Sequence, residues 1–125
     1  MQQLQFEASW DKALSAKDRL KIEGIFTETK NINHSDILFS PIREAINHEE
    51  SLLVTVLIHN FTDYPFGIHH ISLLYSVQGE AFAEGVFTQP ALTVPSKVSM
   101  PWTFIFPKGS YRTQTAYENG QLGLI

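Results

Sequence analysis

Short apolar or alternating segments, separated by turn residues, make up most of the chain beyond residue 50. The clearest is 52–59, Leu-Leu-Val-Thr-Val-Leu-Ile-His, which is rich in β-branched residues and apolar on both faces, so it predicts a central strand. The segment 68–77 predicts a second strong strand, and the two are expected to form a hairpin. Further strands are predicted over 81–87, 92–94 and 98–106. Several short strands with regular turns predict a mainly β fold, an immunoglobulin-like antiparallel β-sandwich.

One segment near the N-terminus has the 3.6-residue period of a helix instead. Ile22 and Ile25 share one helical face within 16–27. Ser15, followed three residues later by Asp18, resembles a capping box at the start of this segment. The expected fold therefore has one N-terminal α-helix in front of the β-sandwich.

The chain of 125 residues has the length of a single domain. Residues 1–9 are polar and are expected to be frayed, whereas Trp10 is expected to dock onto a core. The predicted domain spans 10–107. The tail 108–125 is expected to be flexible or to contain a short strand near 111–117.

Composition narrows the classes of function. The chain has no cysteine, which excludes disulfides, zinc–thiolate sites and iron–sulfur clusters. Its net charge is -4 and its basic residues are scattered, so nucleic acid is a poor partner. No apolar run is long enough to span a bilayer, so no integral membrane segment is expected. The first residues lack the pattern of a signal peptide, which predicts a cytoplasmic protein.

No catalytic motif is present, and neither a catalytic residue nor a cofactor is predicted. No serine stands in a Gly-x-Ser-x-Gly context, and the glycines are dispersed. His69 and His70 are expected to point to opposite faces of a strand and so not to share an ion. His59 and His69 could face each other across the predicted hairpin and hold a metal, but no third ligand has suitable spacing, so two solvated histidines are the simpler interpretation.

Aromatic residues supply the candidate contact sites. Tyr64 and Phe66 flank a proline in a predicted loop, and Trp102 begins an aromatic strand, so these three are the candidate partner-binding residues. Core packing is the alternative interpretation, above all for Trp102. Carbohydrate binding would use Trp102, Tyr64 or Tyr75 as stacking platforms. Asn60, at the end of the central strand, is predicted to fix the following loop by bonding backbone groups.

Several of these segments together resemble the SLAP domain. They are the run 52–60 followed by a proline-containing turn, then Ile-Ser-Leu-Leu-Tyr at 71–75, Val-Pro-Ser at 94–96, and Pro-Trp-Thr-Phe-Ile-Phe-Pro at 101–107. The last segment is the most specific. The resemblance covers roughly residues 10–107, the scale of a whole domain.

The resemblance implies a function. The SLAP family is associated with S-layer protein assembly and the accessory Sec export system of Gram-positive bacteria, and its members are cytoplasmic and are not known as enzymes. The two-copy members act as accessory export factors, whereas this chain has one copy. We therefore expect a protein-interaction module whose partner is a Sec-pathway component or an S-layer precursor. A homo-oligomer formed through the last strand, where Pro101 predicts a sheet edge, is a further hypothesis. A carbohydrate-binding sandwich and a small metal-dependent enzyme remain as alternatives.

Overall fold

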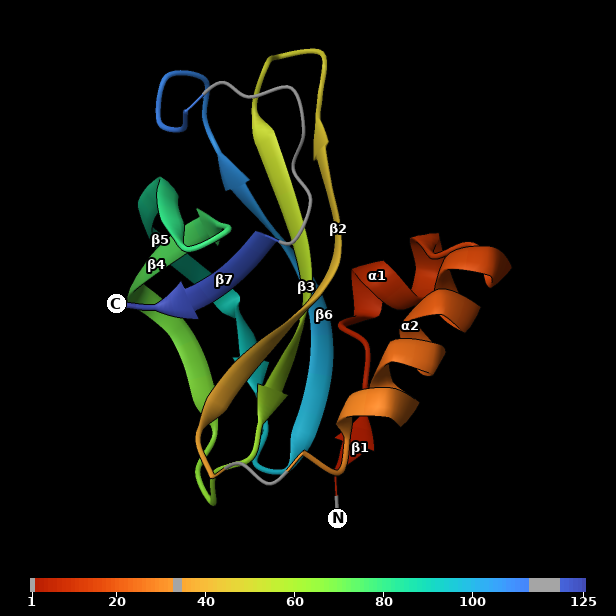
Figure 1. The fold of residues 1–125 in the computed structure, drawn as a ribbon. Helices are drawn as coiled ribbons and strands as arrows, with labels where there is room; N and C mark the ends of the chain where they lie inside the picture. Colours follow the sequence, from red (N-terminus) through yellow and green to blue (C-terminus); the bar gives the residue numbers. More distant parts are fainter. Residues whose placement is uncertain (1, 33–34, 113–119) are drawn as a thin grey trace.

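The computed structural model describes residues 2–32, 35–112 and 120–125 (Figure 1). The described residues form seven strands and two short helices, which confirms the mainly β class. The helices are α1 (Ala8–Ala13) and α2 (Ala16–Thr29); the strands are β1 (Gln3–Leu4), β2 (Ile37–Ile46), β3 (Leu52–Asn60), β4 (Phe66–Val77), β5 (Glu80–Val94), β6 (Val98–Phe106) and β7 (Gly120–Leu124).

The strands form two sheets that pack against each other. One has the order β1-β6-β3-β2 and the other the order β5-β4-β7. The core lies between them; for example, Phe87 of β5 places its ring 5.2 Å from those of Phe104 and Phe106 on β6. Because β1 runs parallel to β6, the first sheet is mixed rather than antiparallel. These pairings do not show the immunoglobulin-like strand order that the sequence predicted.

The helices cover the outer face of the β1-β6-β3-β2 sheet (Figure 1). Helix α2 begins where the sequence predicts: the Ser15 hydroxyl accepts a hydrogen bond from the backbone N–H of Asp18, and Ile22 is buried. The expectation of a single helix is wrong, because α1 precedes it. This six-residue helix is too short to show a hydrophobic period, although the Glu7 carboxylate caps it by accepting the N–H of Ser9. Among the described residues, no helix is long and apolar enough to cross a membrane.

The predicted hairpin between 52–59 and 68–77 is wrong. Strand β3 is central, as expected, but its neighbours are β2 and β6, and β4 lies in the other sheet. Strand β2 continues through Pro41, beyond the point where the sequence indicates extended structure, and β5 combines two predicted strands across Pro90. Both prolines lie in edge strands, where a missing N–H is tolerated. The predicted edge at Pro101 holds only in part: β1 pairs with β6 at Val98 and Ser99, and among the described residues no strand pairs with β6 on that side beyond Ser99.

The two ends of the chain are more ordered than predicted. Residues 3–4 pair with 98–99, so the N-terminal segment is not simply frayed. Strand β7 pairs with β4, and Gly120 is required there because a Cβ atom would lie 1.9 Å from the Tyr75 hydroxyl oxygen. The short strand expected near 111–117 falls mostly outside the described residues.

Candidate functional site

Asn60, the last residue of β3, fixes the loop that follows it. Its side chain is completely buried, at 0% exposure. The amide nitrogen lies within hydrogen-bonding distance of the carbonyl oxygens of Tyr64 (2.8 Å), Val94 (3.0 Å) and Pro95 (3.2 Å). The amide oxygen accepts the backbone N–H of Thr62 at 3.0 Å and the hydroxyl of the same residue at 2.6 Å. The predicted role of Asn60 is therefore confirmed.

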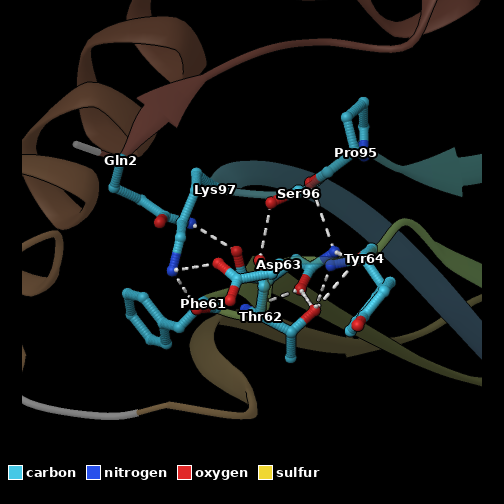
Figure 2. A network of polar contacts seen from close by, with 9 residues as sticks. Gln2, Phe61, Thr62, Asp63, Tyr64, Pro95, Ser96 and Lys97 are labelled. Carbon is cyan, nitrogen blue, oxygen red and sulfur yellow. Dashed lines mark hydrogen bonds and ion pairs between the residues drawn. The ribbon is translucent and has the colours of Figure 1, made fainter.

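The turn before β6 holds the same loop from the other side (Figure 2). The Lys97 ammonium donates to the carbonyl oxygen of Phe61 at 2.7 Å and lies 3.4 Å from the Asp63 carboxylate. The Ser96 hydroxyl donates to the carbonyl oxygen of Thr62 at 2.7 Å. Lys97 has a φ of 61°, the left-handed conformation of a tight turn. Two separate segments thus bond the backbone of loop 61–65.

This arrangement holds the loop backbone and leaves the ring of Tyr64 in solvent. Tyr64 is 76% exposed, whereas its neighbour Phe66 is half-buried and packs against the core. Thr62 also bonds within the loop, where its hydroxyl accepts the N–H of Tyr64 at 3.2 Å. Of the two aromatic residues predicted in this loop, only Tyr64 offers its whole side chain to a partner.

Trp102 occupies a different environment. It lies in the middle of β6 opposite Val56, is half-buried, and packs against the core. Its ring lies 6.2 Å from that of Trp10 on α1, with 30° between the two planes, so the predicted docking of Trp10 is confirmed. Tyr75, the remaining candidate stacking platform, is buried. The carbohydrate hypothesis needs two exposed rings on one face, and among its three candidates only Tyr64 is exposed.

A second group of polar contacts lies next to the loop and centres on His59, the residue of β3 before Asn60. His59 is fully buried, with its Nε2 atom 2.9 Å from the Ser40 hydroxyl and its Nδ1 atom 2.7 Å from the Ser99 hydroxyl. Gln2 links Ser99 to this end of the molecule, because its amide nitrogen donates to the Ser99 hydroxyl and to the carbonyl oxygen of Asn60. Burial lowers the pKa of His59 from 6.5 to about 4, which keeps the ring neutral at physiological pH.

The structure does not bring His59 and His69 together. His59 is buried in one sheet, whereas His69 is exposed on β4 of the other. The metal-dependent enzyme hypothesis rested on this pair. In the part of the chain that the structure describes, no three His, Cys, Asp or Glu residues gather as metal ligands. The expectation that His69 and His70 point to opposite faces is also wrong, because their ring centres lie 4.5 Å apart.

Comparison with known protein families decides the family. The model of the SLAP domain matches residues 4–121, from β1 to the start of β7. This chain belongs to the SLAP-domain family. The family is associated with the accessory Sec system. The match extends beyond the expected 10–107 at both ends. No curated protein and no solved structure matches the chain.

Of the residues that hold Asn60 and the loop of this SLAP domain, the sequence identified Asn60 but not those that reach it from distant parts of the chain. Asn60 stands directly before the loop, so a local rule found it. Lys97 and Gln2 act across 36 and 58 positions of the sequence respectively. The Pro-Ser sequence at 95–96 signals a turn, but no local pattern shows that this turn adjoins loop 61–65.

Proposed function

We propose that this SLAP domain is a non-enzymatic protein-interaction module and that Tyr64 is its main contact residue. One observation carries the proposal: an exposed tyrosine stands on a loop whose backbone is held by buried Asn60 and by Lys97. A tyrosine supplies a large apolar face and a hydroxyl. Because the loop is already ordered, its backbone loses little conformational entropy when a partner binds.

The chemistry around Tyr64 indicates the kind of surface it fits. Asp63 precedes it in the chain and pairs with Lys97, and the side chains of Asp63 and Lys97 are 84% and 46% exposed respectively. An aromatic anchor with a charged rim matches the usual anatomy of a protein interface, in which a ring enters a pocket and charges surround it. Family membership supports a partner from the accessory Sec system, either a Sec-pathway component or an S-layer precursor, and a cytoplasmic location for the encounter.

An affinity capture with three baits tests the proposal. The baits are the wild-type domain, Tyr64→Ala and Leu20→Ala, incubated with lysate of the native host. Leu20 is a matched control, because it is 69% exposed but lies on α2. We expect wild type and Leu20→Ala to retain the same Sec-pathway protein or S-layer precursor. Tyr64→Ala should retain at least about tenfold less, the loss typical of an aromatic hot spot. Equal retention by Tyr64→Ala would refute the assignment.

A further inference from the structure

Strand β4 contains a β-bulge at two consecutive histidines. The pairs on either side of it are Ile68 with Gln89 and Ile71 with Phe87. His69 and His70 therefore lie opposite a single residue of β5, Thr88. His70 has a φ of 49°, in the left-handed region, and its backbone N–H donates to the Thr88 hydroxyl oxygen at 3.0 Å. The bulge is thus fixed to the neighbouring strand by a hydrogen bond.

The bulge changes where the two imidazoles lie. In a regular strand, consecutive side chains point to opposite faces. Here the ring centres of His69 and His70 are 4.5 Å apart, with 83° between the ring planes, and both side chains are exposed. Turning either ring about its Cβ–Cγ bond leaves its centre nearly in place. Rotation about this bond therefore changes where each ring nitrogen points, without any change in the backbone or in the separation of the ring centres.

The spacing suits two imidazoles on one metal ion. A metal–nitrogen bond of about 2.0–2.1 Å places the metal about 3.2 Å from the centre of each ring. Two rings at an angle of about 90°, as in square-planar or octahedral complexes, then have centres about 4.5 Å apart. Tetrahedral coordination would need a wider separation, of about 5.2 Å. The observed 4.5 Å between His69 and His70 matches the 90° arrangement.

We propose that His69 and His70 together bind one divalent transition-metal ion of the Ni²⁺ or Cu²⁺ type, each through one ring nitrogen. Imidazole is a preferred ligand of these ions, and both favour angles near 90°. Within the described residues, no third His, Cys, Asp or Glu joins the pair. The site lies on β4 and is independent of the function proposed for Tyr64.

Calorimetric titration of the full chain with NiCl₂ tests the proposal. The variants are His70→Asn, His69→Asn and the control His48→Asn, which removes an exposed histidine outside the bulge. Asparagine is chosen because it tolerates the left-handed conformation at residue 70. We expect wild type and His48→Asn to bind a single ion. Each bulge variant should bind about a hundredfold more weakly, because losing one ligand removes the chelate advantage.

Two results would overturn the proposal: no saturable binding by the wild type, or wild-type affinity in both bulge variants. Circular dichroism shows whether each variant is folded. His69→Asn keeps the assay decisive if His70→Asn does not fold, because only residue 70 of the pair has a positive φ.

Discussion

Tyr64 and Trp102 are both aromatic candidates for partner binding, yet the structure holds them in opposite ways. Around Tyr64, a polar network bonds the loop backbone and leaves the ring exposed. The side chains that bond the loop are those of Asn60, Thr62, Ser96 and Lys97, and Gln2, His59 and Ser99 extend the network from Asn60. Around Trp102, the ring itself forms the contact with Trp10. Hydrophobic packing therefore covers an aromatic side chain, whereas a polar network that bonds the backbone can leave the side chain exposed to a partner. The variants below test this contrast.

Replacing Asn60, the centre of the polar network, should lower the stability of the domain more than any other change considered. Asn60→Ala removes the hydrogen bonds to the carbonyl oxygens of Val94 and Pro95 and to the backbone N–H of Thr62, at about 1–3 kcal/mol for each buried group left unsatisfied. We expect the free energy of unfolding to fall by about 3–5 kcal/mol, measured by urea denaturation. The remaining folded molecules should show faster amide exchange at Thr62 and Tyr64.

Asn47→Ala is the matched control for this loss. The Asn47 amide oxygen also accepts two backbone N–H groups, those of Glu49 and Ser51, but its side chain is only half-buried. Its replacement should cost about 1 kcal/mol, because water can satisfy the released groups. Equal losses in the free energy of unfolding for the two variants would show that the burial of Asn60 does not increase its contribution to stability.

Acid should weaken the polar network through His59. An unfolded histidine has a pKa of 6.5, and the folded pKa is about 4, so between these values the unfolded chain binds a proton that the folded chain excludes. The free energy of unfolding should be constant with respect to this group above pH 6.5 and fall by up to about 3 kcal/mol as the pH drops towards 4. Urea titrations across pH 4–8 measure the trend. His59→Gln should abolish this component, and an unchanged slope in that variant would contradict the assignment.

Separating Trp10 from Trp102 should lower the free energy of unfolding by a smaller amount and should leave partner binding unchanged. Trp102→Ala is expected to lower the free energy of unfolding by about 2 kcal/mol, below the range for fully buried tryptophan, because the side chain is only half-buried. A double-mutant cycle with Trp10→Ala should give a coupling of about 0.5–1.5 kcal/mol. A folded Trp102→Ala domain that no longer retains the partner would instead place Trp102 in the interface.

The sequence was informative for several features that depend on neighbouring residues. The start of α2 after Ser15, the central position of β3 and the role of Asn60 each follow from a few neighbouring residues. The strand pairing failed because consecutive strands were assumed to be neighbours. In the structure, loop 61–65 leads from one sheet into the other, and only tertiary contacts determine that crossing.

Tertiary contacts also determine which candidate contact residues are exposed, and the sequence does not show these contacts. Exposure separates Tyr64 from Phe66 and Trp102, and it depends on what packs against each ring. The histidine bulge was missed for a related reason: the left-handed conformation of residue 70 breaks the strand alternation, and no glycine or asparagine at that position signals it.

Site-specific photo-cross-linking in the native host tests whether Tyr64 contacts the partner. A photoreactive phenylalanine derivative replaces Tyr64 in one strain and Leu20 in another, and mass spectrometry identifies the linked proteins. We expect a Sec-pathway protein or S-layer precursor to be linked from position 64 and not from position 20. Cross-links to such a protein from position 20, with none from position 64, would contradict this expectation.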